Sequence, residues 1–161
     1  MISPGIFRQY DIRGIYGKDL TVEAAEAIGR GYAVLLAERG LRGAVAVGRD
    51  NRPSGDALRD ALVKGLTTSG LDVIDIGVVP TPTLQLAVEH HHAGAGLMLT
   101  ASHNPVEWNA LKLVGPDGIF LDGESGAAVR ALAEKGAPRA GWDTIGAVRE
   151  GLDPGAMENL Q

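Results

Sequence analysis

The chain has 161 residues, 45% of them hydrophobic, which is enough to bury the core of one domain. Its 15 basic and 20 acidic residues give a net charge of −5, which disfavours nucleic acid as a partner because no cationic excess is present to neutralise phosphates. No cysteine, signal-peptide pattern or apolar run of ~18 residues is present, so we expect a soluble, cytoplasmic protein without disulfides, cysteine-bound zinc or a membrane partner.

Two kinds of segment alternate along the first part of the chain. Short β-favouring or continuous apolar runs predict strands over residues 10–16, 44–47, 71–76 and 95–100. Apolar residues at helical spacing predict helices between these strands, beginning at the capping residues Thr21, Ser54 and Thr81. Pro82 suits the first turn of the third helix, and Gly40 and Gly70 can end the first two. This alternation favours right-handed crossovers and a mainly parallel sheet covered on both faces.

The second part of the chain predicts a change in strand direction. Residues 108–114 and 119–121 flank a turn sequence rich in glycine, so two further strands are expected, one of them antiparallel. Asp122 can start a last helix. The predicted fold class is α/β, with a three-layer α/β/α arrangement and a mixed, mainly parallel sheet. We assign one domain to residues 1–136 and treat residues 137–161, which show no clear period, as a C-terminal extension.

The turn after the fourth predicted strand carries the residues best suited to chemistry. Ser102 precedes Asn104-Pro105, a turn signal that predicts a sharp, exposed bend. In open parallel sheets, ligands bind beyond the carboxyl ends of the strands, so this turn should gather with the loops over residues 48–53 and 77–81. Considered without its surroundings, a turn hydroxyl such as that of Ser102 more often caps local backbone groups.

Four short segments form a series along the chain. They are residues 7–14 (FRQYDIRG), 47–54 (VGRDNRPS), 77–82 (GVVPTP) and 100–105 (TASHNP). Together they resemble, in the right order, the sequence blocks of the α-D-phosphohexomutases, the family of bacterial phosphomannomutases and phosphoglucomutases. The resemblance corresponds to the first of that family's four domains and implies a fold of the phosphoglucomutase first-domain type. One departure is Ala110, which stands where the family usually has glycine shortly before Lys112.

The resemblance implies a role for particular side chains. Ser102 corresponds to the family's phosphoserine, and Arg13, Lys112 and His103 to the donors around its phosphoryl group, with Tyr10 lining the same substrate-binding cleft. In the family, Mg²⁺ is held by the phosphoserine and an aspartate-rich loop of the second domain. Ser102 would therefore bind metal only through its phosphate and together with that second domain.

The resemblance also implies an activity, which we set beside an alternative of another class. Family members are isomerases of the intramolecular phosphotransferase type, which interconvert hexose 6-phosphate and hexose 1-phosphate, of mannose and/or glucose, through a hexose 1,6-bisphosphate that also activates the enzyme. The expected partners are a phosphorylated hexose and the remaining domains, so the chain alone should be inactive, as a fragment of a larger enzyme would be. The alternative is a stand-alone, non-catalytic binding or assembly module that keeps the same fold.

Several side chains have plainer explanations than catalysis. His103 alone would be an ordinary loop histidine, and Lys112 alone a solvated strand lysine. The run of histidines over residues 90–92 could hold a metal, but consecutive side chains on a helix diverge, which favours a solvated helix end. A polar cluster after the second strand either contacts phosphate or orders its own loop; it consists of Arg49, Asp50 and Arg52.

Overall fold

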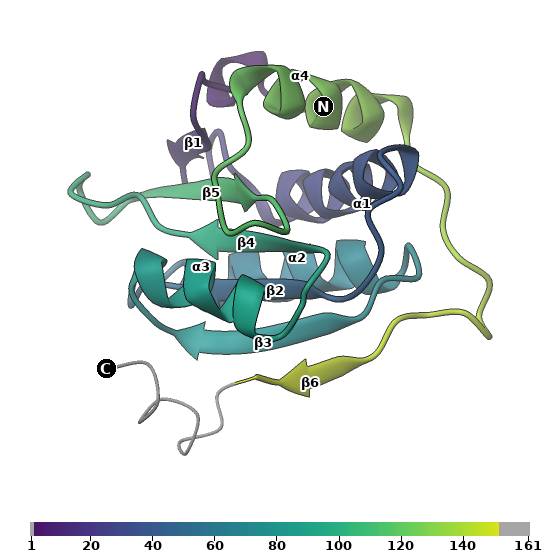
Figure 1. The fold of residues 1–161 in the computed structure, drawn as a ribbon. Coiled ribbons are helices and arrows are strands. Elements are labelled where there is room, and N and C mark those ends of the chain that lie inside the picture. The colour runs from purple at the N-terminus through teal and green to yellow at the C-terminus, as the bar shows by residue number, and fades with distance from the viewer. Residues whose placement is uncertain (1, 152–161) are drawn as a thin grey trace.

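A single six-stranded sheet organises the molecule (Figure 1). The computed structural model describes residues 2–151. The strands are β1 (Ile12–Ile15), β2 (Val45–Arg49), β3 (Val73–Val78), β4 (Ala95–Leu99), β5 (Trp108–Val114) and β6 (Val148–Glu150), in the order β1-β5-β4-β2-β3-β6. β5 runs antiparallel to both of its neighbours, and the other pairings are parallel. The mixed, mainly parallel sheet that the sequence predicted is therefore confirmed.

Helices cover both faces of this sheet unequally. The helices are α1 (Val22–Glu38), α2 (Gly55–Thr67), α3 (Thr81–His90) and α4 (Gly123–Lys135), and a 3-10 turn, η1, covers Pro4–Ile6. α1 packs against both α2 and α4, and the buried residues of these three helices form one apolar cluster with the sheet. α3 alone contributes to a second cluster on the opposite face, where it lies across the middle strands (Figure 1). The predicted three-layer arrangement is thus present.

The central strands are largely apolar because both of their faces are buried. In β2, Val45 and Val47 belong to the cluster under α1 and α2, whereas Ala46 between them belongs to the cluster under α3. Tyr32 of α1 is also fully buried, and its hydroxyl donates a hydrogen bond to the carbonyl of Val114 at 3.0 Å. Burial raises the pKa of Tyr32, so this hydroxyl serves as a neutral donor inside the core.

Two of the predicted helix caps are formed as expected. The Thr21 hydroxyl accepts a hydrogen bond from the N–H of Ala24 at 3.1 Å, and the Asp122 carboxylate accepts one from the N–H of Ser125 at 2.9 Å. Gly136 follows α4 with a φ of 82°, a left-handed conformation that suits glycine at a helix end. These signals act between close neighbours in the chain, which is why they could be read from the sequence.

Two other caps were predicted wrongly. Ser54 already has helical backbone angles and makes no capping hydrogen bond; its hydroxyl accepts a hydrogen bond from the amide of Asn109 at 2.9 Å instead. α3 begins one residue earlier than predicted, so that Thr81 is its first helical residue and Pro80 occupies the cap position. Pro82 still lies in the first turn, where its missing N–H costs nothing.

The strands predicted near the end of the chain also differ from the structure. Residues 119–121 form no strand, and only Phe120 makes an isolated bridge, with Val114. β6 lies in the segment 137–161, where the sequence predicted no element, and pairs in parallel with β3. All three β6 residues are exposed, so the strand has no apolar period that would reveal it. The part of the extension beyond residue 151 lies outside the described residues, and the domain boundary at residue 136 stays a prediction.

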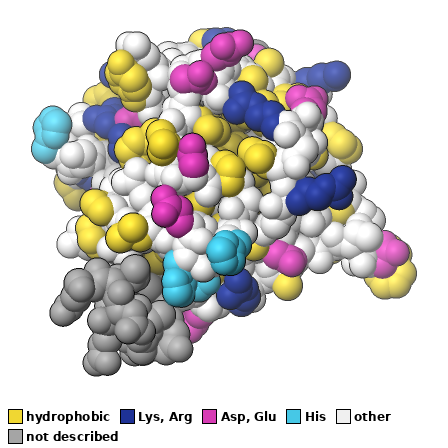
Figure 2. Space-filling view, viewed as in Figure 1, with side chains coloured by type: hydrophobic (Ala, Val, Ile, Leu, Met, Phe, Trp, Pro, Cys, Tyr) yellow, Lys and Arg dark blue, Asp and Glu magenta, His cyan; other side chains and the backbone are white. Residues whose placement is uncertain are grey.

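The surface of the described residues carries both signs of charge. Lysine and arginine side chains are interspersed with acidic ones over the face shown in Figure 2, with apolar side chains between them. Among residues 2–151, no helix is long and apolar enough to cross a membrane.

Candidate functional site

Ser102 lies on an exposed bend just beyond the carboxyl end of β4. Its φ of 54° is in the left-handed region, which residues with a side chain rarely adopt. The N–H of Asn104 donates to the carbonyl of Ala101 at 3.0 Å and closes the bend. The Ser102 Oγ lies 3.4 Å from Nδ1 of His103, and both side chains are exposed. The sharp, exposed bend that the sequence predicted is confirmed, and we call residues 100–108 the serine loop.

Arg13 and Lys112 lie on neighbouring strands and share one carboxylate. The pairing of β1 with β5 places Ile12 opposite Leu111, which brings the flanking charged residues together. Oδ2 of Asp11 accepts hydrogen bonds from Arg13 at 2.6 Å and 3.1 Å and from the Lys112 ammonium at 3.3 Å. All three side chains are less than one-fifth exposed. Sequence reasoning had assigned no role to Asp11, although it stands within the same motif as Arg13.

The side chain of Asn104 connects this cluster to the serine loop. One terminal nitrogen of Arg13 donates to Oδ1 of Asn104. The sequence alone indicates Asn104 only as a turn residue before Pro105. The structure shows that it also links Arg13, on an edge strand, to the loop that carries Ser102.

A hollow of about 360 Å³ lies beside the cluster of Arg13, Asp11 and Lys112. Its lining also includes Tyr10, whose side chain is 70% exposed and so stands mostly in solvent. Three of the predicted site residues, Tyr10, Arg13 and Lys112, therefore meet around one hollow. Ser102 and His103 are not part of its lining, and their connection to it runs through the bond between Asn104 and Arg13.

Ala110 occupies the position at which the resemblance led us to expect glycine. It lies within β5, opposite Arg13 of β1, and its backbone continues the regular pairing of the two strands. Extended backbone accommodates any side chain, so glycine's freedom is not required at this position. The departure from the family pattern leaves Lys112 beside Asp11.

The loop after β2 lies beside the end of β4, as predicted, and the loop after β3 lies beside the end of β2. The N–H of Asp50 donates to the carbonyl of Leu99 at 2.9 Å, and the N–H of Val79 donates to the carbonyl of Arg49 at 2.9 Å. Arg49 forms an ion pair with Asp56 of α2 at 2.6 Å. The Arg49 side chain is therefore directed toward α2 and not toward Ser102.

The described residues supply no complete metal site. Within residues 2–151, no group of three or more histidine or acidic side chains could hold a metal ion. In the histidine run, Nε2 of His91 lies 2.9 Å from the carbonyl oxygen of Gly151, while His90 and His92 are exposed. Magnesium requires several oxygen ligands, so the expected role of Ser102 in metal binding depends on a phosphate and on residues from elsewhere.

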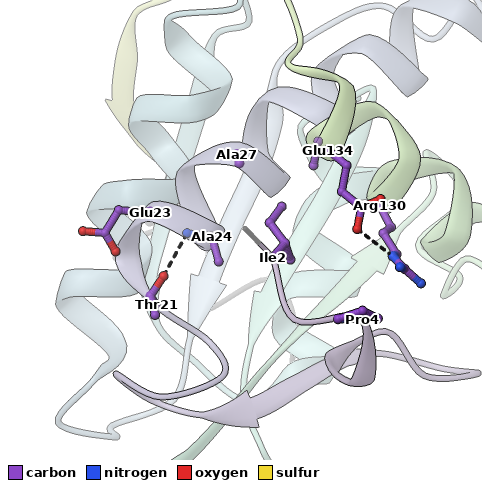
Figure 3. A pocket seen from close by; sticks show the side chains of 9 residues that line it. Ile2, Pro4, Thr21, Glu23, Ala24, Ala27, Arg130 and Glu134 are labelled. Carbon is purple, nitrogen blue, oxygen red and sulfur yellow. Dashed lines mark hydrogen bonds and ion pairs between the residues drawn. The ribbon is translucent and has the colours of Figure 1, made fainter.

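A more spacious hollow lies away from the serine loop, between η1, the start of α1 and α4 (Figure 3). Its volume is about 770 Å³, and it contains none of the predicted site residues. Three of the polar side chains at its walls have partners, since the Thr21 hydroxyl caps α1 and Arg130 pairs with Glu134 at 2.9 Å, while Glu23 is exposed (Figure 3). Space alone therefore does not indicate the site, and the chemistry of the side chains points to the serine loop.

Comparison with known proteins agrees with this assignment of the fold. The family model described as "Phosphoglucomutase/phosphomannomutase, alpha/beta/alpha domain I" matches residues 4–140. The chain is 44% identical over 147 residues to a phosphoglucomutase/phosphomannomutase of Thermococcus kodakarensis, covering 90% of this chain and 32% of that protein. It is 39% identical over 137 residues to a phosphoglucosamine mutase of Pelotomaculum thermopropionicum, covering 85% of this chain and 31% of that protein.

A solved structure shows the same arrangement of elements. The crystal structure of a phosphoglucomutase/phosphomannomutase family protein from Burkholderia thailandensis superposes with a TM-score of 0.79 at 32% identity, covering 93% of this chain and 33% of that chain. The chain thus spans about a third of the length of the relatives that it matches. From its sequence blocks, its sheet and these matches, we conclude that the chain belongs to the phosphoglucomutase/phosphomannomutase family and comprises its alpha/beta/alpha domain I.

Proposed function

We propose that this chain is the catalytic phosphoserine domain of a phosphohexomutase, which interconverts hexose 6-phosphate and hexose 1-phosphate through a hexose 1,6-bisphosphate. The observation that carries the proposal is the exposed Ser102 on its left-handed bend, joined through Asn104 to Arg13. Two of the relatives are named for glucose or mannose and for glucosamine. The proposal therefore covers mannose and/or glucose phosphates and leaves the choice of sugar open.

In the proposed first transfer, the bond between phosphorus and Ser102 Oγ breaks while a bond forms from a sugar hydroxyl oxygen to phosphorus. The sugar hydroxyl loses its proton and Ser102 ends as a neutral hydroxyl. This proton passes between the two oxygens directly or through the imidazole of His103, which lies 3.4 Å from the serine oxygen. The second transfer runs the same step in reverse, from the other phosphate of the bisphosphate. Because the reactant and the product of each transfer are both phosphate monoesters, the reaction has no intrinsic direction.

Arg13 and Lys112 supply positive charge to the transferring group. A phosphoryl group on serine carries about −1.5 to −2 charges near neutral pH and needs cations nearby. Two cations and the single carboxylate of Asp11 leave one net positive charge in the cluster. In the proposal, Tyr10 contacts the sugar phosphate, and its place in the lining of the same hollow supports this role.

The proposed role of this chain in magnesium binding is limited to Ser102. In the complete enzyme, a phosphate on Ser102 and carboxylates of the remaining domains would hold Mg²⁺, which would neutralise part of the phosphate charge. Those domains are partners of this chain in the proposed enzyme. The expected cytoplasmic location also stays a prediction.

A hybrid enzyme tests the proposal. In this hybrid enzyme, the present chain replaces the matching third of the Thermococcus kodakarensis relative. We expect it to convert glucose 1-phosphate to glucose 6-phosphate when magnesium and glucose 1,6-bisphosphate are present, and we expect Ser102→Ala to abolish this activity. Phosphopeptide mass spectrometry should find the stable phosphoryl group of this chain on Ser102.

Several outcomes would overturn the proposal. A hybrid enzyme that is folded by circular dichroism but no more active than its Ser102→Ala variant would favour the non-catalytic module. Phosphate on another residue of this chain, with none on Ser102, would contradict the assignment of the serine. The chain of 161 residues on its own should fold yet sustain no turnover, because most positioning groups would come from other domains.

A further inference from the structure

Arg52, in the loop after β2, is bonded to the serine loop at several points. Its Nη1 donates to the carbonyls of Pro105 at 2.6 Å and Trp108 at 3.0 Å. Its Nη2 donates to the carbonyls of Ser102 at 2.9 Å and Asn104 at 2.7 Å. The side chain is only 9% exposed. One planar guanidinium thus ties together the backbone on both sides of the bend, which the single ammonium of a lysine could not do.

Asp50 fixes the orientation of this guanidinium. Its carboxylate accepts from Nε of Arg52 at 3.1 Å and from the N–H of the same residue at 3.1 Å. It also accepts from the hydroxyl of Thr100 at 2.7 Å, and that hydroxyl oxygen in turn accepts from the N–H of Ser102 at 3.0 Å. Ser102 is therefore held at its N–H through Thr100 and at its carbonyl by Arg52.

The donor count excludes a second role for Arg52. A guanidinium has five N–H donors, and here Nε donates once while Nη1 and Nη2 donate twice each. All five donors are occupied by the protein, so none is free for a phosphate. The sequence left two possibilities open for this cluster, contact with phosphate or ordering of its own loop. Neither describes Arg52 fully, because Arg52 also orders the serine loop.

The conformation of Ser102 needs such support. A left-handed φ is unfavourable for a residue with a side chain and persists only where the surroundings impose it. The bend is exposed and has little apolar packing to hold it, since Ser102, His103 and Pro105 are all exposed. Besides the bond from the N–H of Asn104 to the carbonyl of Ala101, the polar contacts of Arg52 and Thr100 hold the backbone of Ser102 itself.

We propose that Asp50, Arg52 and Thr100 form a clamp that holds Ser102 in the left-handed conformation and so positions its Oγ for phosphoryl transfer. Arg52 is then a positioning residue that acts through the serine loop and not a phosphate ligand. This inference rests on the proposed function for its catalytic consequence. Its structural part, that the clamp stabilises the conformation of the serine loop, can be tested without any measurement of activity.

Amide hydrogen exchange on the chain of 161 residues tests this structural part. In Arg52→Lys we expect the hydrogen-bonded amides of the serine loop, those of Ser102, Asn104 and Trp108, to exchange about tenfold faster or more, because the loop opens locally while the sheet stays closed. The matched control is Arg59→Lys, since Arg59 is also partly buried and paired, to Asp75 at 2.5 Å and Asp60 at 2.8 Å, but lies on α2. Unchanged exchange in Arg52→Lys, or an equal increase in Arg59→Lys, overturns the clamp.

A second variant covers the case in which Arg52→Lys does not fold. Thr100→Val keeps the shape of the side chain but removes the acceptor for the N–H of Ser102 and the donor to Asp50. We expect it to speed exchange at the Ser102 amide as well. If the Ser102 amide in Thr100→Val exchanges as in the wild type, the clamp is also overturned.

The hybrid enzyme tests the catalytic consequence. We expect Arg52→Lys to lower kcat about 100-fold, as a displaced reacting atom does, with KM and the Tm close to those of the wild type. A purely structural arginine would change the Tm and leave kcat of the folded enzyme unaltered. If Ser102→Ala is inactive while Arg52→Lys has normal kcat, the positioning role is wrong and the proposed function stands. An inactive wild-type hybrid enzyme overturns the proposed function and the positioning role with it, while hydrogen exchange still decides whether the clamp holds the loop.

Discussion

α1 and α2 pack closely together because Gly65 has no side chain at their contact. The serine loop, in contrast, is held by hydrogen bonds that involve Arg52 and Asp50. A Cβ added at Gly65 would collide with the backbone carbonyl of Glu26 and would lie 3.0 Å from the backbone nitrogen of Arg30. Around this contact the side chains of Leu62 and Leu66 are completely buried. The serine loop has no such packing, and its carbonyls accept hydrogen bonds from Arg52.

The contact between α1 and α2 serves the stability of the fold, whereas the serine loop serves the proposed function. Apolar packing between α1 and α2 tolerates no added volume, because the neighbouring atoms belong to rigid backbone. We call the cluster of Asp11, Arg13 and Lys112 together with the serine loop the polar edge of the sheet. It contributes less buried apolar surface, so its side chains can be changed while the core stays intact. Substitutions in the two regions should therefore affect different measurements.

The largest effect should come from the cations at the polar edge. In the hybrid enzyme, Arg13→Ala and Lys112→Ala should each raise the activation free energy by about 3 kcal/mol, or lower kcat about 100-fold, because each removes a fixed donor to the transferring phosphoryl group. The Tm of the variants should stay near that of the wild type. Steady-state kinetics and thermal unfolding measure the two quantities.

The control for this prediction is Lys64→Ala. Lys64 is a 60% exposed lysine in the last turn of α2 that pairs with Glu26 of α1 at 2.8 Å. Its removal should leave kcat unchanged. Near-normal kcat in either Arg13→Ala or Lys112→Ala would show that this residue has no catalytic role.

A smaller effect is expected at the contact between α1 and α2. Gly65→Ala should lower the free energy of unfolding by about 2 kcal/mol through overpacking, although alanine is the better helix former by about 1 kcal/mol. Urea denaturation of the chain of 161 residues measures this change.

The matched control is Gly126→Ala within α4, where an added Cβ would meet nothing within 4 Å. Here only helix propensity acts, so the free energy of unfolding should rise by about 0.5 to 1 kcal/mol. Equal changes at Gly65 and Gly126 would show that the two helices can move apart at no cost. In that case, the contrast between the packed face and the polar edge would not hold.

The smallest effect concerns the cap of α4 and depends on pH. The backbone N–H and the hydroxyl of Ser125 donate to the Asp122 carboxylate and hold its pKa below the ordinary value of 3.8. A lowered folded-state pKa means that the stabilisation is fully present above pH 3.8 and is lost as the pH falls below it. Asp122→Ala should therefore lower the Tm at about pH 6 by more than at about pH 3.

Asp122→Asn provides the comparison, because asparagine keeps an acceptor for the cap but does not titrate. Its Tm relative to that of Asp122→Ala should change little with pH. If the wild type and Asp122→Ala differ equally at both pH values, the charge of Asp122 contributes nothing to the cap.

The sequence by itself was sufficient for the elements whose signals lie close together in the chain. Thr21 and Asp122 cap helices through residues only three positions away, so their roles follow from the order of the residues alone. The bend at Ser102 follows likewise from the neighbouring Asn104 and Pro105. The apolar run of β2 already indicated a strand buried on both faces.

Only the tertiary structure decided the contacts between distant segments. Ser54 caps no helix because Asn109, far along the chain, takes its hydroxyl. Asp11 joins Arg13 to Lys112 because β1 pairs with β5 in one particular register, and Arg52 reaches the serine loop because β2 ends beside β4. Such partners depend on strand order and register, which arise from packing the whole sheet, and no local pattern of residues records them.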